Sequence, residues 1–368
     1  MRALIVDIGA GTMDILCWDM DSGEHFKAVA KSPVRTLAEV AARSTGNLLI
    51  SGVEMGGGPL SEVLKERAKS AEVIMSGSAA ATIHHDPDRV RSWGIKVLEN
   101  GEVEALVQEG RYTHLATADL DVARIREILH GLGVSFSFDV VGLCAQDHGV
   151  PPRGVSHLDY RHNLFKATLE GQPYPHAVLY RKDEVPETFS RLKALAESAG
   201  ALSAEEIYVM DSGMAAILGA TMDPGAKEQE LVLVLDVATS HTVGAALEGE
   251  EIAGFFEYHT RDITLERLEG LLVDLAEGNL SHSQILEEGG HGAYVRKTLG
   301  FENIEIIIAT GPKRGLVQNS HLDMVQGAPL GDNMMTGTAG VLEAIGRRKG
   351  LKPWASHGLL RRRIKKIL

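Results

Sequence analysis

Residues 4–16 read Leu-Ile-Val-Asp7-Ile-Gly9-Ala-Gly11-Thr12-Met-Asp14-Ile-Leu: an apolar strand, a turn of small residues and a second apolar strand. Gly9 and Gly11 have no Cβ, so their N–H groups can approach phosphate oxygens closely, with positive φ if the turn requires it. Asp7 and Asp14 would repel a bare polyanion but suit one that carries a divalent cation. The segment therefore predicts either a β-hairpin that grips phosphates or an ordinary hairpin whose turn holds Gly and Asp.

The length and composition predict a globular protein. A chain of 368 residues with 44% hydrophobic residues is long enough for about two domains with full cores. The net charge of -13 argues against a general nucleic-acid binder, which needs a basic surface. The two cysteines, Cys17 and Cys144, exclude a disulfide framework or a cysteine-rich metal site. No signal segment precedes the strand at Ala3, so we expect a cytoplasmic protein.

The end of the sequence is basic. Residues 359–368 read Leu-Leu-Arg-Arg-Arg-Ile-Lys-Lys-Ile-Leu, with apolar residues at helical spacing and Trp354 just upstream. Such a segment can lie on a membrane surface, dock a partner or pack its apolar stripe on its own domain. The sequence has no apolar run of the length, about 20 residues, that spans a bilayer.

Apolar runs alternate with helical patterns along the chain, which is typical of an α/β protein. The predicted strands are 3–8, 13–18, 47–51, 72–76, 104–108, 138–145, 206–210, 231–237, 242–247, 251–256 and 304–309. The predicted helices are 35–43, 60–68, 122–131, 186–199, 213–220, 264–276, 283–287 and 333–347.

The strand–turn–strand pattern of residues 4–16 occurs a second time. A polar segment at 222–230 precedes an apolar run that ends in Asp236, followed by a small-residue turn with Thr239 and a return strand. One supersecondary unit in each half of the chain predicts two similarly built lobes, with a ligand between them.

Three further segments contain small residues that allow close contacts of the backbone. They are 210–219 (Met-Asp-Ser-Gly-Met-Ala-Ala-Ile-Leu-Gly), 306–314 (Ile-Ile-Ile-Ala-Thr-Gly-Pro-Lys-Arg) and 331–345, which contains Gly337, Ala339 and Gly340. With the two hairpins, these segments resemble, in order, the first phosphate motif, first connecting helix, second phosphate motif, adenosine motif and second connecting helix of one superfamily. It is the superfamily of actin, the 70-kilodalton heat-shock chaperones, and the sugar and acetate kinases.

The resemblance implies a two-lobed actin-like ATPase fold of the α/β class: duplicated ribonuclease H-like lobes, mixed sheets flanked by helices, and an interdomain cleft. We expect an N-terminal lobe at 1–221 that holds the first phosphate motif and insertions. A C-terminal lobe at 222–346 holds the second phosphate and adenosine motifs, and a basic tail follows at 347–368.

The resemblance also implies ATP and Mg²⁺ as cofactors. Asp7 and Asp236 would face each other across the cleft and hold Mg²⁺ through water. The nucleotide would be bound by residues of the two hairpins and the adenosine motif: Asp7, Gly9, Gly11, Thr12, Asp14, Thr239, Ser240, Thr310, Gly311, Pro312 and Arg314.

The second phosphate turn departs from the superfamily pattern. It has Val237, Ala238 and Thr239 where glycines are usual, and His241 stands in the turn. Either the side chains of Thr239, Ser240 and His241 hold the γ-phosphate, or the pocket has lost tight triphosphate binding.

Catalytic candidates are Asp211, His241, Asp147 and His148. Asp211 stands where the superfamily often places a group that orients the attacking water, and it is also a suitable N-cap for the following helix. Asp147 and His148 follow an apolar run, where the end of a strand presents catalytic groups or where the chain simply turns.

Two further segments are candidates for an acceptor or metal site. His84-His85-Asp86 could ligate a metal, although neighbours on a strand point apart. Gly56-Gly57-Gly58 could form part of a site for a phosphoryl acceptor. His259 and His291 fit structural or surface positions better.

Segments such as 56–59, 145–149 and 289–293 resemble a bacterial and archaeal branch of the superfamily that is sometimes labelled pyruvate formate-lyase activating enzyme-like. A radical activase of that type needs three closely spaced cysteines for an iron–sulfur cluster, and this chain has two that lie far apart.

The expected function is therefore Mg-ATP binding with phosphoryl transfer to water or to a small molecule. The alternative is a nucleotide-switched binding or filament-forming protein without a small-molecule substrate. The expected partners are a nucleotide and possible small-molecule or protein ligands, with no nucleic acid and with membrane-surface contact only through 359–368.

Overall fold

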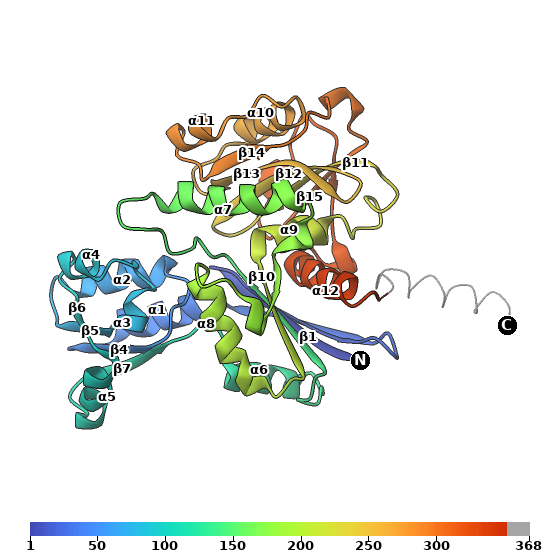
Figure 1. Ribbon diagram of the computed structural model, residues 1–368. Coiled ribbons are helices and arrows are strands. Elements are labelled where there is room, and N and C mark those ends of the chain that lie inside the picture. The colour runs from blue at the N-terminus through green and yellow to red at the C-terminus, as the bar shows by residue number, and fades with distance from the viewer. Residues whose placement is uncertain (352–368) are drawn as a thin grey trace.

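The computed structural model describes residues 1–351, which form two large sheets and one small sheet (Figure 1). The first large sheet has the order β3-β2-β1-β8-β10-β9. Its strands are β1 (Arg2–Ile8), β2 (Thr12–Asp19), β3 (His25–Lys31), β8 (Val140–Ala145), β9 (Leu179–Arg181) and β10 (Glu206–Asp211). The second has the order β14-β13-β12-β11-β15-β16. Its strands are β11 (Leu231–Val237), β12 (His241–Glu248), β13 (Glu251–His259), β14 (Gly292–Val295), β15 (Ile306–Thr310) and β16 (Met324–Gln326).

The two large sheets repeat one topology. In the first, β1, β2 and β3 form an antiparallel meander and β8 joins the other side of β1 in parallel. In the second, β11, β12 and β13 form the same meander and β15 joins β11 in parallel. This duplicated ribonuclease H-like arrangement confirms the predicted fold.

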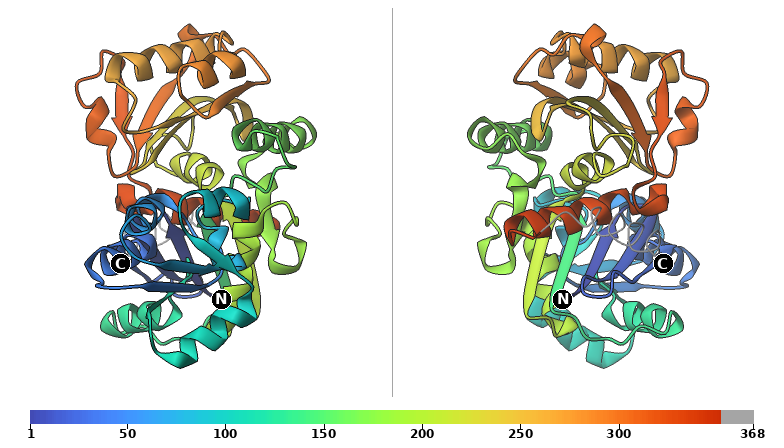
Figure 2. Two further views of the ribbon diagram at one scale, coloured as in Figure 1. Left: turned by 90° about the vertical axis from the view of Figure 1, so that its left-hand side faces the viewer. Right: turned by 90° about the vertical axis from the view of Figure 1, so that its right-hand side faces the viewer.

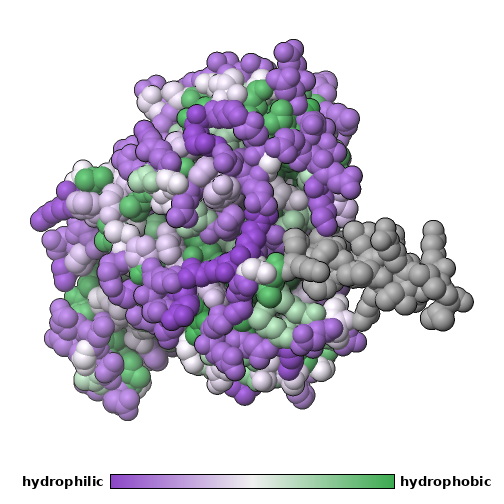
Figure 3. All heavy atoms as spheres, turned by 45° about the vertical axis from the view of Figure 1, so that its right-hand side comes forward, coloured by the Kyte–Doolittle hydropathy of each residue, from purple (hydrophilic) through white to green (hydrophobic). Residues whose placement is uncertain are grey.

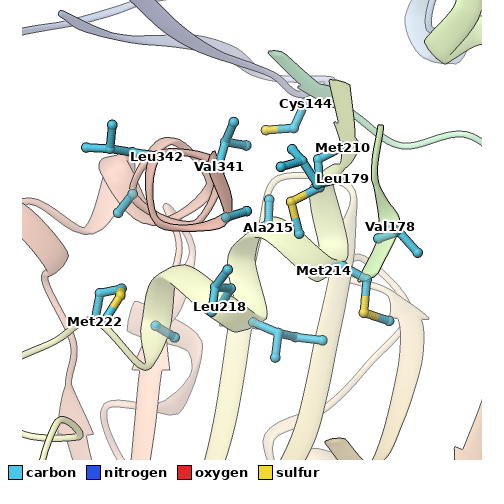
Figure 4. Packing of buried hydrophobic residues seen from close by; sticks show 14 of the residues in the cluster. Cys144, Val178, Leu179, Met210, Met214, Ala215, Leu218, Met222, Val341 and Leu342 are labelled. Carbon is cyan, nitrogen blue, oxygen red and sulfur yellow. The ribbon is translucent and has the colours of Figure 1, made fainter. Parts of the chain in front are cut away.

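Helices cover both faces of each large sheet (Figures 1 and 2). The outer face of the first packs on α6 (Val122–Gly131) and α8 (Ser190–Ser198), and that of the second on α10 (Leu265–Ala276) and α11 (His282–Glu287). Between the sheets lie α9 (Ser212–Ala220) and α12 (Thr336–Arg348). Their buried side chains join strand residues of both sheets in one hydrophobic cluster, part of which is seen in Figure 4.

The helices α9 and α12 touch through their backbones. A Cβ on Gly219 would lie 1.8 Å from the carbonyl oxygen of Thr336, and one on Gly340 would lie 1.8 Å from that of Ala215. The predicted close crossing of two small-residue helices is therefore confirmed.

The small sheet is inserted between β3 and β8 and has the order β6-β5-β4-β7, with all strands parallel. Its strands are β4 (Leu48–Gly52), β5 (Val73–Ser76), β6 (Lys96–Leu98) and β7 (Thr113–Thr117). Its helices are α1 (Pro33–Arg43), α2 (Gly58–Arg67), α3 (Gly77–Ala80), α4 (Pro87–Ser92) and α5 (Asn100–Glu109). This unit has its own hydrophobic core around Leu48, Ile50, Leu60 and Leu64.

The predicted strand at 104–108 is wrong, because these residues belong to α5. A capping box joins Glu99 and Glu102 at the start of that helix, and Gly110, with φ of 67°, ends it. The run Ala-Leu-Val fits a strand and a helix equally well, and the capping residues decide between them. The other predicted strands and all the predicted helices lie within a few residues of observed elements.

The helix α7 (His157–Gly171) was not predicted. It buries only Arg161, Phe165 and Leu169, one residue per turn, and one of the three is charged. Such a narrow stripe gives almost no amphipathic signal in the sequence. This helix nevertheless carries a central residue of the site described below.

The face of the molecule in Figure 3 is mostly hydrophilic, with hydrophobic residues in small scattered groups. In residues 1–351, no helix combines the length and the hydrophobicity that crossing a membrane requires. The predicted amphipathic segment 359–368 and Trp354 lie outside the described residues.

Candidate functional site

The turn between β1 and β2 faces the second lobe. A hydrogen bond closes this turn: the Gly9 N–H donates to the Thr12 carbonyl at 3.0 Å. Ser32 holds the turn from outside, because its N–H donates to the Gly11 carbonyl at 3.1 Å and its Oγ donates to the Gly9 carbonyl at 2.6 Å. Asp7 and Asp14 are paired across the hairpin directly behind this turn.

The turn between β11 and β12 is held by the same pattern of hydrogen bonds. The Ala238 N–H donates to the His241 carbonyl at 3.1 Å. Thr260 takes the place of Ser32: its N–H donates to the Ser240 carbonyl and its Oγ1 to the Ala238 carbonyl, both at 2.8 Å. Asp236 then corresponds to Asp7. The two turns are thus structural repeats, although one contains glycines and the other does not.

Neither Gly9 nor Gly11 has a positive φ, so the turn itself does not require glycine. What excludes a side chain at Gly11 is the opposite lobe: a Cβ there would lie 2.5 Å from Thr239 Oγ1. The two turns are therefore in contact at Gly11 and Thr239.

Three carboxylates gather behind the two turns. Asp14 and Asp236 are each 7% exposed, and Asp7 is partly buried. Desolvation, against a hydrogen bond with Cys144 and together with the charges of Asp236 and Asp211, raises the pKa of Asp7 to about 7. Desolvation followed by the charge of Asp7 raises the pKa of Asp14 to about 8. Desolvation raises that of Asp236 to about 6.

The Asp14 carboxylate is the least satisfied of the three. Its Oδ2 accepts a hydrogen bond from Thr12 Oγ1 at 3.3 Å, while its Oδ1 is buried and has no hydrogen-bond partner in residues 1–351. A buried, crowded and partly unpaired set of carboxylates is costly unless a cation neutralises it.

We therefore expect Asp14→Asn to stabilise the protein when magnesium and nucleotide are absent. The folded-state pKa of about 8 lies above the usual 3.8, so the stability that the protonated carboxyl contributes is present at low pH and is lost as the pH rises from about 4 to about 8. One pKa unit corresponds to about 1.4 kcal/mol, so a gain of about 2–4 kcal/mol is expected at pH 8.5 and little at pH 4. Thermal melts in EDTA at both pH values measure this difference. Equal melting temperatures at pH 8.5 would contradict it.

The predicted adenosine motif lies beside Asp236. Thr310 Oγ1 donates to Asp236 Oδ1 at 3.0 Å, and Asn333 Nδ2 donates to the Gly311 carbonyl at 2.9 Å. Gly311 has φ of +88°, and a Cβ there would lie 2.6 Å from the Val237 carbonyl oxygen. Glycine is required at this position both for its conformation and for the close approach of the two segments.

Pro312 and Arg314 lie further out. Pro312 is exposed in the loop after Gly311. The Arg314 guanidinium donates to the Gly327 carbonyl and borders a cavity of about 510 Å³. The cavity is lined by Arg314, Gly315, Val317, Gln318, Ser320, Leu322, Asp323, Met324 and Gln326.

Both carboxylate oxygens of Asp211 are engaged. Oδ1 caps α9 by accepting from the N–H groups of Gly213 and Met214, so the expected N-cap is confirmed. Oδ2 accepts from Arg161 Nη1 at 2.9 Å. A role in orienting water stays a prediction.

Asp147 holds a turn. Its Oδ1 accepts from the Gly149 N–H at 2.7 Å and its Oδ2 from the Leu192 N–H at 2.9 Å, and the residue is 2% exposed. These bonds engage both carboxylate oxygens, so the structure gives Asp147 the turn role that was one of its two expected roles. Its catalytic role stays a prediction.

His148 and His241 lie with two other histidines where the lobes meet. The ring centroid of His241 is 4.6 Å from that of His291 and 4.9 Å from that of His259, and the His148 centroid is 5.8 Å from that of His291. His259 and His291, which were expected at structural or surface positions, thus lie beside two of the catalytic candidates. We call His148, His241, His259 and His291 the histidine cluster.

Glu257 and Arg161 border the histidine cluster. Glu257 Oε1 lies 3.3 Å from His291 Nδ1, and Glu257 Oε2 is 3.4 Å from Arg161 Nη2. Burial opposes ionisation of Glu257, but the charge of Arg161 holds the pKa of its carboxyl well below the usual range. Arg161 therefore joins Asp211 of the first lobe to Glu257 of the second.

His84, His85 and Asp86 lie between α3 and α4 of the small unit, outside the histidine cluster. Asp86 caps α4, and His85 Nε2 lies 2.8 Å from Glu54 Oε1 and 3.3 Å from Ser190 Oγ. His84 packs edge-on against Trp93.

Sequence reasoning missed three charged residues of the site: Arg161, Glu257 and Arg191. Arg191 makes two hydrogen bonds to Asp119, at 2.7 and 3.0 Å, and its charge lowers the pKa of Asp7. A Cβ on Gly56 would lie 2.8 Å from its guanidinium. Arg161 was missed because the helix that carries it was not predicted. Arg191 was missed because the other charged residues of its helix are exposed or half-exposed, so nothing in the sequence sets it apart from them.

A family model described as "Putative pyruvate format-lyase activating enzyme (DUF1786)" matches residues 55–316. The match includes the second phosphate turn, Asp211 and all four members of the histidine cluster. Among curated proteins, none matches the chain significantly.

Several solved structures resemble the chain at low sequence identity. Component A of the (R)-2-hydroxyglutaryl-CoA dehydratase of Acidaminococcus fermentans is 10% identical with a TM-score of 0.34, over 93% of this chain and 96% of that chain. A ROK hexokinase from Thermus thermophilus is 14% identical with a TM-score of 0.29, over 96% and 91%. A Listeria monocytogenes protein described as "a putative N-acetylmannosamine kinase" is 10% identical with a TM-score of 0.26, and the match covers 68% of this chain but only 49% of that one. The fold assignment rests on the sheet topology given above.

Proposed function

The chain belongs to the family described as "Putative pyruvate format-lyase activating enzyme", and from its site we propose a different activity: it binds Mg-ATP between its lobes and transfers the γ-phosphoryl group to water or a small molecule. The activity in the family's description requires cysteines for an iron–sulfur cluster. The chain has two cysteines, Cys17 and Cys144, and both are buried in strands of the first large sheet.

The observation that carries the proposal is the pair of equivalent turns with carboxylates behind them. Asp7 and Asp236 occupy the same position in the two repeats, so the two lobes supply matching oxygen donors. Mg²⁺ prefers such hard oxygen ligands and keeps several of its waters. The raised pKa values of Asp7 and Asp236 and the unpaired Asp14 Oδ1 fit a site that is completed by a cation.

The turn between β1 and β2 would bind the phosphates. Gly11 allows close approach of the backbone, and Thr12 supplies a hydroxyl. On the opposite side, Thr239 and Ser240 supply hydroxyls in place of the usual glycine N–H groups. Bound Mg-ATP would provide the phosphoryl group with its charge neutralised, and the chain then has mainly to position it.

The position of Arg191 indicates where a phosphoryl acceptor would bind. Its side chain is 15% exposed, it lies against Gly56, and its charge acts on Asp7. The loop at Gly56, Gly57 and Gly58 is thus at the same cleft as the carboxylates. We place the phosphoryl acceptor, where there is one, between this loop and the β1–β2 turn.

We expect Mg-ATP at millimolar concentration to raise the melting temperature, because a ligand that binds only the native state stabilises it. In Asp7→Ala the part of the shift that depends on Mg²⁺ should disappear, since one of the two matching donors is gone. Saturation at 100 times Kd corresponds to about 2.7 kcal/mol, which is readily measured as a shift in melting temperature. Differential scanning fluorimetry with ATP, with and without magnesium, measures both effects.

The matched control is Asp88→Ala, which removes a carboxylate whose side chain is 73% exposed and forms an ion pair with Arg91. It should keep the full magnesium-dependent shift. No shift of the wild-type protein with any adenine nucleotide would overturn the proposed function. Release of inorganic phosphate from ATP, measured with and without candidate acceptors, separates transfer from binding alone.

A further inference from the structure

The histidine cluster places three ring nitrogens around one point. Ligand atoms of His148, His241 and His291 all lie within 4.8 Å of one another. His148 follows β8 of the first large sheet, His241 begins β12 and His291 precedes β14 of the second. Both lobes therefore contribute.

Hydrogen bonds fix which nitrogen of two of these rings is free. His241 Nδ1 lies 2.8 Å from Ser240 Oγ, and its Nε2 is buried without a hydrogen-bond partner in the described part of the chain. His291 Nε2 lies 3.0 Å from His259 Nε2, and its buried Nδ1 faces Glu257 Oε1 at 3.3 Å without the geometry of a hydrogen bond. When Nδ1 of His241 and Nε2 of His291 carry the protons, the other nitrogen of each ring offers a lone pair. Metal-binding histidines in proteins are fixed in this way by a second partner.

The surroundings of the rings keep His148 and His241 neutral. Desolvation, followed by the charge of Arg161, lowers the pKa of His148 well below its usual value, and desolvation lowers that of His241 to about 4. Neutral imidazole is the form that binds metals. The nearby positive charge of Arg161 is offset by its ion pairs with Asp211 and Glu257.

We propose that His148, His241 and His291 bind one divalent first-row transition-metal ion, of the zinc class, with the Glu257 carboxylate beside it. Three imidazoles suit zinc, cobalt, nickel or copper, whereas magnesium prefers oxygen ligands. The site is thus distinct in chemistry from the carboxylate site behind the two turns, and it goes beyond the proposed function. Because His241 stands in the second phosphate turn, the ion would lie close to the phosphate-binding end of the cleft.

The spacing also predicts a structural effect of the metal. Zinc–nitrogen bonds of about 2.1 Å in a tetrahedral site place nitrogens about 3.4 Å from one another, a spacing that falls within the 4.8 Å limit found here. Since His148 belongs to the first lobe and the other two to the second, the metal would hold the lobes together.

Titration with Co²⁺ of the full chain, stripped of metal with EDTA and without nucleotide, tests the site directly. We expect one equivalent to bind, with the strong visible absorption of a four- or five-coordinate nitrogen site, and to be displaced by Zn²⁺ but not by millimolar Mg²⁺. Weak absorption like that of aqueous Co²⁺, or displacement by Mg²⁺, would overturn the proposal. Either result is independent of whether Mg-ATP binds, which is measured separately on the metal-free protein.

Variants locate the site. His148→Ala, His241→Ala and His291→Ala should each weaken Zn²⁺ binding by about 100-fold or more, and Ser240→Ala, which removes only the partner of His241, by about 10-fold. His162→Asn is the matched control, because this half-buried ring stacks on His282 outside the cluster, with centroids 3.7 Å apart. Melting curves in EDTA show whether each variant is folded. If Zn²⁺ affinity falls equally in the control and in the three cluster variants, the metal does not bind at the histidine cluster.

Discussion

Gly340→Ala is expected to cost about 4 kcal/mol or more of the free energy of unfolding, or to prevent folding. The added Cβ would lie 1.8 Å from the Ala215 carbonyl oxygen, 2.7 Å from its carbonyl carbon and 2.8 Å from the Gly219 nitrogen. All three atoms are backbone, so no side-chain rotation can relieve the contact. The helices α9 and α12 would have to separate.

Separation is costly because of what surrounds these helices. Almost every residue of α12 is buried, and α9 is buried from Met214 to Ala220. Figure 4 shows Val341 and Leu342 of α12 beside Ala215 and Leu218 of α9, within one cluster of hydrophobic residues. That cluster joins the two large sheets, so a displacement of either helix opens the core of both lobes.

Gly346→Ala is the matched control. This glycine lies in the same helix, and a Cβ there would have no described atom within 4 Å. Since alanine is favoured over glycine in a helix interior by about 1 kcal/mol, Gly346→Ala should leave stability unchanged or raise it. Urea unfolding of both variants measures the difference. A Gly340→Ala protein as stable as the control would show that the two helices are not packed through their backbones.

The same two helices show what the sequence could predict. The first hairpin, its repeat at Asp236 and the small residues of 210–219 and 331–345 are local patterns, and each constrains the backbone where it stands. Their order along the chain was enough to predict two equivalent lobes. Gly11 was interpreted as a residue that lets the backbone approach phosphates, and the sequence could not show the second reason for glycine there, its contact with Thr239 of the other lobe.

The site could be predicted only in part, because the histidine cluster is formed by contacts between segments that are distant in the sequence. His148, His241 and His291 come from three elements, and nothing in the residues around each one indicates the other two. His241 was interpreted as a substitute for glycine at a phosphate, but its free nitrogen lies beside other imidazoles. Glu257 is one of several acidic residues in its region, and only the fold identifies it as the one buried beside Arg161.

Arg161→Met is expected to destabilise the protein by about 3–5 kcal/mol, because it removes the positive partner of two buried carboxylates. The Arg161 side chain is 9% exposed, and those of Asp211 and Glu257 are 3% and 6% exposed. Its Nη1 also donates to the Asp147 carbonyl at 2.5 Å, so the loss leaves a backbone acceptor without its donor. Methionine keeps much of the contact with the Phe165 ring, 4.5 Å from the guanidinium carbon, so the loss of charge is the main change.

Two further variants show whether the loss comes from charge. Glu257→Gln in the Arg161→Met background should recover part of the lost stability, since one unpaired buried charge is then removed. Arg91→Met, which breaks an exposed ion pair with Asp88, should cost less than about 1 kcal/mol. Chemical unfolding of the single and double variants gives the coupling energy between Arg161 and Glu257. If the second substitution recovers nothing, the pairing of Arg161 with Glu257 does not stabilise the contact between the lobes, and Asp211 with the Asp147 carbonyl accounts for the whole effect.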